Sequence, residues 1–381
     1  MIINSILDND FYKFTMMHAV WAKYPDAHVT YKFINRSPTD TFTEPFLEKL
    51  KRCIKELETI YLTEEEFKWA HSVNLLPPEY WEYLKMFRYN ADFVKCRLNK
   101  DNQLELQISG PWVETILFEV PLLALITQTY FEDRGKVDLA DYKLRTFEKG
   151  LKLSKHGCLF TEFGTRRRRS YNVQQAVIEA FMELPKVGDY KSTYIGTSNV
   201  HFSRIYNTPP IGTMAHEWIM GHAGMFGVVG SNAKALDVWL DVFASKYLIG
   251  LTDTYTRETF FKEFTEKLAK SYSGIRQDSG DPLTFIEQAL EFYDQFNIDP
   301  KTKEVVFSDN LTVDRVLEIE NKVNKRFKSI YGIGTHFTND VIGSKALNIV
   351  IKLASINGKS VFKLTDAKDK ACGKGELFDE N

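Results

Sequence analysis

The chain of 381 residues has little cysteine and no long apolar run. Its four cysteines (Cys53, Cys96, Cys158 and Cys372) are scattered without a Cys-x-x-Cys pair, which argues against a zinc site and against a disulfide framework. The longest apolar run, Val120 to Ile126, is far shorter than the roughly 20 residues that a membrane helix needs. The first ten residues lack the basic and apolar regions of a signal peptide. We therefore expect reduced thiols, no membrane partner and a cytoplasmic location.

The chain also lacks an excess of charge and any low-complexity tract. Its 49 Lys and Arg nearly balance 51 Asp and Glu, so no overall field attracts nucleic acid. Hydrophobic residues make up 44% and charged residues 26%, as in ordinary globular proteins, which excludes disordered and fibrous classes. The only dense basic run, residues 166–169, is too short for a nucleic-acid site and is typical of a phosphate clamp.

Residues 1–135 combine helical patterns with alternating strand patterns. Apolar spacing predicts a helix capped by Asp8 or Asn9, and residues 28–35 alternate like a strand. Thr63 and Glu66 have the spacing of a capping box, which marks the start of another helix. Two strand-like runs flank residues 99–102 as in a hairpin. Together these patterns predict an α+β domain.

From about residue 150, strand-like runs alternate with helical stretches. The strand-like runs number seven: CLFTEFG, STYIGTSN, IGTMAH, LTDTYT, GIRQDSGD, EVVFSDN and SIYGIGTHFTND. One intervening helix is predicted over residues 282–296, with Asp281 as its N-cap and Pro282 in its first position. This alternation predicts a parallel sheet. An irregular α/β barrel fits the spacing better than an open doubly wound sheet.

Small polar residues follow several of these predicted strands. In a parallel α/β fold such residues meet at the carboxyl ends of the strands, where ligands bind. Glycine lets the backbone approach a phosphate closely, while hydroxyl and amide groups donate to its oxygens. Each segment alone is also typical of an ordinary turn. We expect a substrate with more than one phosphate to bind at residues 196–199, 278–281, 308–310 and 332–335.

His216 follows the segment IGTM and is a candidate nucleophile or base beside these loops. The alternative is a hydrogen-bonded structural histidine. His222 comes six residues later, not four, so this pair does not have the spacing of a zinc protease. Asp278 could bind Mg²⁺ or stabilise positive charge on a sugar ring, whereas Asp281 has the structural alternative of a helix cap. We place the chemistry first on Arg276 and Asp278.

Seven segments, in order, resemble the nicotinate phosphoribosyltransferase family of the bacterial and fungal type: DNDFYKFTM, EFGTRRR, GTSNV, GTMAHEW, RQDSGDP, FSDN and YGIGTHFTND. The resemblance implies a type II phosphoribosyltransferase fold. It has an N-terminal α+β sandwich domain (residues 1–135, completed by part of 345–381) and an irregular, TIM-like α/β barrel (residues 136–344). The implied activity joins nicotinate to phosphoribosyl pyrophosphate, which yields nicotinate mononucleotide and pyrophosphate for NAD salvage. The resemblance further implies ATP as co-substrate, Mg²⁺ as cofactor and a homodimer with shared active sites.

The resemblance also implies roles for individual residues. His216 resembles the histidine that ATP phosphorylates, and Arg276 and Asp278 resemble the catalytic groups around the phosphoribosyl moiety. Tyr12, reaching into a partner subunit, and Phe163 resemble the two aromatic faces around the nicotinate ring. The implied substrate-binding set comprises Tyr12, Phe163, Arg166, Thr197, Ser198, Asn199, Ser279, Gly280, Gly332, Gly334 and Thr335. No metal ligands are assigned.

Ser198 separates two related activities. Nicotinamide phosphoribosyltransferase is similar but carries an aspartate at this position, and a carboxylate would repel nicotinate while a hydroxyl can donate to it. The acid is therefore the expected substrate and nicotinamide the alternative. The GTMAHE segment argues against quinolinate phosphoribosyltransferase, and a phosphate-binding barrel of the aldolase or isomerase type is a more distant alternative because the predicted strand ends lack lysine and glutamate.

Overall fold

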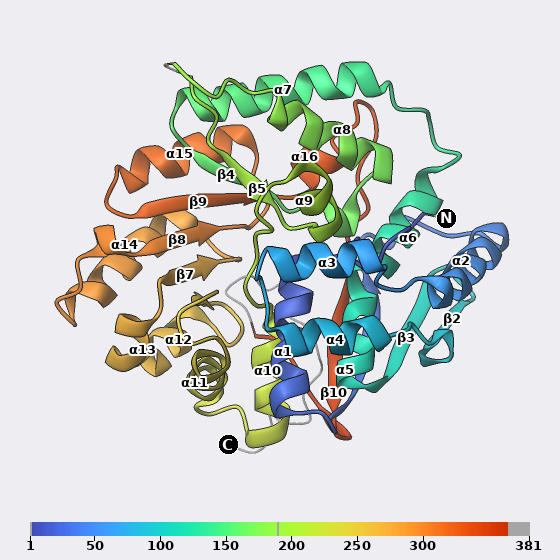
Figure 1. Cartoon of the computed structure of the whole chain (residues 1–381), viewed down its shortest axis with the longest axis horizontal. Helices are drawn as coiled ribbons and strands as arrows, with labels where there is room; N and C mark the ends of the chain where they lie inside the picture. Colours follow the sequence, from blue (N-terminus) through green and yellow to red (C-terminus); the bar gives the residue numbers. More distant parts are fainter. Residues whose placement is uncertain (1, 189, 365–381) are drawn as a thin grey trace.

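The computed structural model describes residues 2–188 and 190–364 and has a two-domain architecture (Figure 1). Cys372 and the last part of the range 345–381 lie outside the described residues. The three other cysteines are free, and Cys53 and Cys158 are buried.

The N-terminal domain packs helices against one face of an antiparallel sheet. The sheet has the order β11-β10-β1-β3-β2, so two of its strands come from the end of the described chain. β10 pairs with β1 from Val29 opposite Ile356 to Asn35 opposite Ile349. The elements are α1 (Phe11–Lys23), β1 (His28–Asn35), α2 (Glu44–Glu56), α3 (Glu64–Ser72), α4 (Pro78–Met86), β2 (Val94–Leu98), β3 (Leu104–Pro111), α5 (Trp112–Thr115), α6 (Glu119–Phe131), β10 (Ile349–Ile356) and β11 (Lys359–Ser360).

Most local predictions for this domain are confirmed. The strand at residues 28–35, the hairpin of β2 and β3, and the capping box of Thr63 and Glu66 are all present. The predicted cap of α1 is wrong, because Asp10 occupies that position. Asp8 instead forms an ion pair with Arg168, and the Asn9 side chain donates to the Leu117 carbonyl.

The second domain contains a parallel sheet with the order β5-β4-β9-β8-β7-β6. Helices α7, α8, α14 and α15 lie around the outside of this sheet (Figure 1). The elements are α7 (Leu139–Lys155), β4 (Leu159–Glu162), α8 (Tyr171–Met182), β5 (Tyr194–Thr197), α9 (Val200–Tyr206), α10 (His216–Phe226), α11 (Ser231–Phe243), β6 (Ile249–Leu251), α12 (Arg257–Glu263), α13 (Glu266–Ser271), β7 (Gly274–Gln277), α14 (Pro282–Asp294), β8 (Glu304–Phe307), α15 (Val313–Val323), β9 (Lys328–Ile333) and α16 (Thr335–Thr338).

Two of the seven predicted strands are wrong: IGTMAH forms no strand, and LTDTYT overlaps β6 only at Leu251. The neighbourhood of IGTMAH touches the sheet at an isolated bridge between Thr197 and Pro210 and through a hydrogen bond from Ile211. The Met214 carbonyl also accepts from Arg276 of β7. Pro209 and Pro210 carry no N–H group, so a regular ladder cannot continue through them. β5 and β6 are therefore the two edge strands of the parallel sheet. The chain between them contains α10, whose first residue is His216.

A continuous helical segment, Trp112–Phe131, is long and apolar enough to cross a membrane by length and composition. Inside the protein, 89% of its most apolar stretch is buried. It packs against α2, β10 and the turn after β4, as a core helix does. This segment is therefore part of the core that carries the site.

Candidate active site

A cavity of about 320 Å³ lies where strand ends of the parallel sheet face the N-terminal sheet. Residues after β4, β7, β8 and β9 line one wall, as expected from the small polar segments. The opposite wall comes from Arg36, directly after β1, from Asn348, directly before β10, and from residues of β10 itself. The walls include Arg36, Phe163, Arg166, Arg167, Arg276, Asp278, Ser308, Asp309, Asn310, Gly332, Gly334, Thr335, Asn348, Lys352 and Lys363. Because six of these side chains are cationic, the cavity suits a polyanion.

A smaller cavity of about 50 Å³ adjoins the first. The two share Arg166, Arg276, Asp278 and Lys352. The smaller cavity is also lined by Tyr12, Tyr31, Glu119, His216, Glu217 and Leu353. The structure therefore brings His216, Arg276 and Asp278 together with Tyr12 and Arg166, as the sequence patterns suggested.

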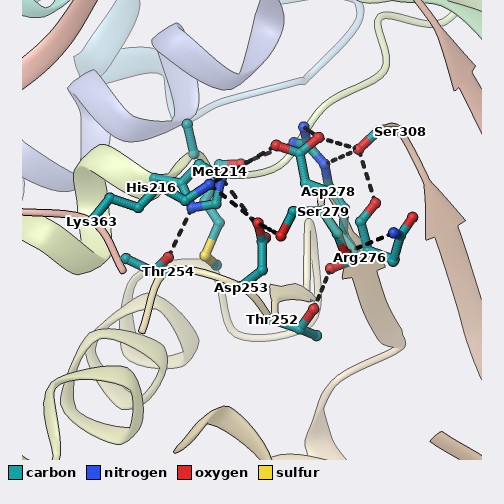
Figure 2. A network of polar contacts seen from close by, with 12 residues as sticks. Met214, His216, Thr252, Asp253, Thr254, Arg276, Asp278, Ser279, Ser308 and Lys363 are labelled. Atoms are coloured by element: carbon teal, nitrogen blue, oxygen red, sulfur yellow. Dashed lines mark hydrogen bonds and ion pairs between the residues drawn. The ribbon is translucent and has the colours of Figure 1, made fainter. Parts of the chain in front are cut away.

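His216 is buried and contacts several polar groups (Figure 2). Its Nδ1 lies 2.9 Å from the Thr254 hydroxyl, and its Nε2 lies 2.8 Å from the Lys363 ammonium. An ammonium can only donate, so we assign the lone pair to Nε2 and the ring proton to Nδ1. Asp278 Oδ2 is 3.2 Å from the same Nε2. Burial, and then the Lys363 charge, lower the pKa of His216 to about 4, which keeps the imidazole neutral at physiological pH.

Arg276 and Asp278 form the link between the histidine and the end of β8. Arg276 Nη2 lies 3.3 Å from Asp278 Oδ1, and the Ser308 hydroxyl donates to the same oxygen at 2.7 Å. Burial opposes ionisation of Asp278, but the Arg276 guanidinium holds the pKa of its carboxyl well below the usual range. Asp278 is therefore an anion beside a neutral imidazole.

Asp253 and Lys363 belong to this cluster and were missed by the sequence analysis. Asp253 accepts from the Ser279 hydroxyl at 2.6 Å and from Lys363 at 3.1 Å. Asp253 does follow β6 in the segment LTDTYT, so its position after a strand could have identified it. Lys363 follows β11 in an extended stretch, and no motif marks it. Only the tertiary structure places it against His216.

Ligand atoms of His216, Asp253 and Asp278 lie within 4.8 Å of one another, as in a metal site. The Lys363 ammonium already bridges His216 and Asp253. A cation in that position repels a divalent ion. This cluster therefore does not fit Mg²⁺, which also prefers oxygen ligands to imidazole.

The four adjacent arginines have different environments. Arg166 lines both cavities, and Arg167 lines the larger one and donates to the Ile349 carbonyl. Arg168 is fully buried in a two-armed ion pair with Asp8, with both nitrogen–oxygen distances at 2.7 Å. Arg169 donates to Ser344 and to the Arg134 carbonyl. Arg168 and Arg169 are thus buried and bonded within the chain, and neither lines either cavity.

The two predicted aromatic faces lie in different cavities. Phe163 lines the larger cavity, and Tyr12 lines the smaller one, 5.8 Å from the Arg166 guanidinium. Within its own chain α1 packs into the core, and Tyr12 is 7% exposed, while its reach into a partner subunit stays a prediction. The Tyr12 hydroxyl is buried without a hydrogen-bond partner among the described residues, so it is available to a ligand.

Three predicted substrate contacts on β5 and its loop lie beneath the cavity surfaces. Thr197 donates to Glu162, Ser198 donates to Asp10 at 2.7 Å, and Asn199 caps α9. None of them lines either cavity. Their assignment as substrate contacts stays a prediction, since in this structure their side chains bond to Glu162, to Asp10 and to the first turn of α9.

The loops after β7 and β9 also differ in part from the expectation. Ser279 bonds to Asp253, and Gly280 has a φ of +73°, which favours glycine in the turn before α14. Gly332, Gly334 and Thr335 line the larger cavity. A Cβ on Gly332 would lie 2.4 Å from the Phe163 ring, so packing against Phe163 requires glycine there.

Comparisons with known proteins give one consistent result. Residues 7–127 match the nicotinate phosphoribosyltransferase N-terminal domain, and residues 158–380 match the nicotinate phosphoribosyltransferase family. Nicotinate phosphoribosyltransferase of Methanosarcina mazei is 40% identical, with 99% of this chain and 97% of the relative covered. A crystal structure of nicotinate phosphoribosyltransferase from Porphyromonas gingivalis has a TM-score of 0.94 at 34% identity, covering 99% and 97% of the two chains. One of a putative nicotinate phosphoribosyltransferase from Saccharomyces cerevisiae has a TM-score of 0.92 at 34% identity, with 98% and 95% covered.

Proposed function

Since this chain belongs to the nicotinate phosphoribosyltransferase family, we propose that it transfers the phosphoribosyl group of phosphoribosyl pyrophosphate to the ring nitrogen of nicotinate. The products are nicotinate mononucleotide and pyrophosphate. The observation that carries this proposal is the pair of adjoining cavities that share Arg166, Arg276 and Asp278. The larger, cationic cavity suits the phosphates, and the smaller one offers Tyr12 and Arg166 to an aromatic acid.

The residues at the junction of the cavities can stabilise the transfer. As the bond between ribose and pyrophosphate breaks, positive charge develops on the sugar and negative charge on the leaving group. The anionic Asp278 is suited to the positive charge, and the cations of the larger cavity are suited to the pyrophosphate. A preformed arrangement of this kind lowers the barrier without reorganisation.

We further propose that ATP phosphorylates His216. The support is a buried imidazole that stays neutral, with Asp278 and Lys363 at its unprotonated nitrogen. That nitrogen attacks the terminal phosphorus of ATP and ADP departs, and water later releases phosphate from the histidine. The phosphohistidine adds negative charge at the cavity junction, where it would be compensated by Lys363 and Arg276.

Mg²⁺ would be held near the larger cavity rather than at His216. The oxygen-bearing side chains that line this cavity include Asp278, Asp309 and Asn310. Such oxygens fit Mg²⁺, which in phosphate sites keeps waters and shares its ligands with the substrate. When bound, the ion would neutralise phosphate charge. The protein's cations and carboxylates then orient the polyphosphate.

The test is a mixing assay with purified protein, phosphoribosyl pyrophosphate, Mg²⁺ and either nicotinate or nicotinamide, with and without ATP. We expect mononucleotide from nicotinate, and ATP should stimulate its formation. Product from nicotinamide instead would contradict the assignment of the acid as substrate. No product from either base would overturn the proposed transfer.

His216→Ala tests the phosphohistidine. We expect this variant to lose stimulation by ATP and labelling by ATP that carries radioactive terminal phosphate, while a weak ATP-independent transfer persists. His156→Ala, at an exposed position after α7, is the matched control and should keep both properties. Full stimulation of the His216→Ala variant would refute the role of this histidine.

A further inference from the structure

A buried ammonium lies between two carboxylates next to the smaller cavity. Lys13 of α1 is completely buried, and its Nζ is 2.6 Å from both Glu119 Oε2 and Glu217 Oε2. Burial by itself lowers the pKa of Lys13, but Glu119 and Glu217 together raise it above its ordinary value. Lys13 is therefore a fixed positive charge between α6 and α10.

Each carboxylate continues to a residue of the candidate active site. Glu217 immediately follows His216 at the start of α10, and its other oxygen accepts from Tyr31 at 2.5 Å and from the Trp112 indole at 2.7 Å. Glu119 lies 3.4 Å from Arg166 Nη1. A chain of contacts thus runs from Arg166 through Glu119 and Lys13 to Glu217, which is the residue directly after His216.

Stability alone gives little reason for this arrangement. A buried ion pair is costly to desolvate, and apolar side chains of similar volume are often at least as stabilising. Lys13 lines neither cavity, whereas Glu119 and Glu217 line the smaller one. The two formal positive charges of Lys13 and Arg166 balance the two negative charges of the carboxylates. What the network specifies is therefore the position of α10 relative to α6 and Arg166.

We propose that Lys13 is a positioning residue, which holds His216 at a fixed distance from Arg166 by bridging Glu217 and Glu119. Without the ammonium, the two carboxylates repel each other, and the start of α10 moves away from α6. His216 and Arg166 then no longer have the spacing needed to contact substrates that are bound together in the site. The consequence for coupling rests on the proposed function, in which His216 uses ATP and Arg166 faces nicotinate.

The test compares Lys13→Met, Glu217→Gln and the double variant, which removes one charge of each sign. For each protein the measurements are kcat/KM for nicotinate with and without ATP, ATP hydrolysed per mononucleotide formed, and the melting temperature. Lys23→Met is the matched control, because Lys23 lies on the same helix and pairs with Asp241 on the surface.

We expect Lys13→Met and Glu217→Gln to lower kcat/KM by about 10- to 100-fold, since a shift of about 1 Å in a positioned group can cost that much. Both should hydrolyse several-fold more ATP per product, and the double variant should show a loss smaller than the combined single losses. Lys23→Met should match the wild type in every measurement. A lower melting temperature alone, with unchanged kcat/KM and ATP ratio, would mean a merely structural role and would overturn the proposal.

Two further outcomes remain informative. If Lys13→Met fails to fold, Glu217→Gln decides, and wild-type kcat/KM and ATP ratio in that variant refute the positioning role. If the wild type forms mononucleotide without hydrolysing ATP, the proposed ATP coupling fails instead. The positioning role of Lys13 is then tested by the transfer reaction without ATP. In that reaction kcat/KM should still fall in Lys13→Met but not in Lys23→Met.

Discussion

At the residue scale, burial decides which polar side chains near the strand ends can meet a substrate. Arg166 and Arg168 are two positions apart, yet Arg166 lines both cavities and Arg168 is fully buried against Asp8. The Ser198 hydroxyl likewise donates its hydrogen bond to Asp10 and not to a cavity. Residue type predicted what these side chains can bind, but their partners within the chain decide whether they are free to bind it.

Glu162 offers a residue-scale test of burial. It is completely buried at the end of β4 and accepts hydrogen bonds from Thr197 and Gln174, and no cation within the described part of the chain pairs with it. Burial raises the pKa of its carboxyl to about 7, above the unfolded value of about 4.5. The folded state therefore binds the proton more tightly, and the stability contributed by the protonated form is lost as pH rises through 7.

We predict that Glu162→Gln removes this pH dependence. The free energy of unfolding of the wild type should fall by about 2–3 kcal/mol relative to the variant between about pH 5 and about pH 8. Urea unfolding of both proteins at several pH values measures the difference, in which all other titrations cancel. A constant difference across this range would contradict the prediction.

At the element scale, capping patterns predicted the starts of α3 and α14 but not that of α1. They succeed where the two capping partners are close in sequence. Asp281 accepts from the Thr284 backbone at 2.9 Å and so caps α14, as predicted. The helix ends at Asp294, two residues before the predicted end. The segment IGTMAH failed at this scale, because the prolines before it prevent a ladder that its composition alone favoured.

Asp281 and Asp278 make a matched pair for testing a structural role against a chemical one. We predict that Asp281→Ala lowers the free energy of unfolding by about 1 kcal/mol, the usual value of an N-cap, and leaves kcat/KM nearly unchanged. Asp278→Asn should instead lower transfer by about 100-fold or more, since it removes charge at the cavity junction. Steady-state assays and denaturant unfolding separate the two. Equal losses of transfer in both variants would refute the distinction.

At the scale of the whole molecule, the C-terminal strands tie the two domains together. β10 leaves the end of the second domain and pairs with β1, and the residues around it line both cavities. The N-terminal sheet is therefore incomplete without a segment more than 300 residues away in sequence. The site exists only when both domains are folded.

This sharing predicts one cooperative unfolding transition. Leu353→Ala on β10, whose side chain is 3% exposed, should destabilise the protein by about 2–5 kcal/mol and shift the entire transition while keeping it single. Tryptophan fluorescence and circular dichroism should give coincident curves. Lys359→Ala, exposed on β11, is the control and should leave the midpoint in place. Two separate transitions would show that the domains unfold independently.

The sequence by itself determined the features that depend on neighbouring residues. These include the strand at residues 28–35, the capping box, the α14 cap and the polar loops after β7, β8 and β9. It also determined the family, because seven segments occur in the right order. Local backbone geometry and hydrogen bonding act over a few residues, so these signals survive without tertiary contacts.

Only the tertiary structure decided which side chains share a site. It placed Lys363 and Asp253 against His216, put Lys13 between two carboxylates, and drew Thr197, Ser198 and Asn199 beneath the cavity surfaces. These arrangements join groups 35 to 204 residues apart in sequence. They follow from packing and from the need to satisfy every buried charge and hydrogen-bonding group, which no local pattern encodes.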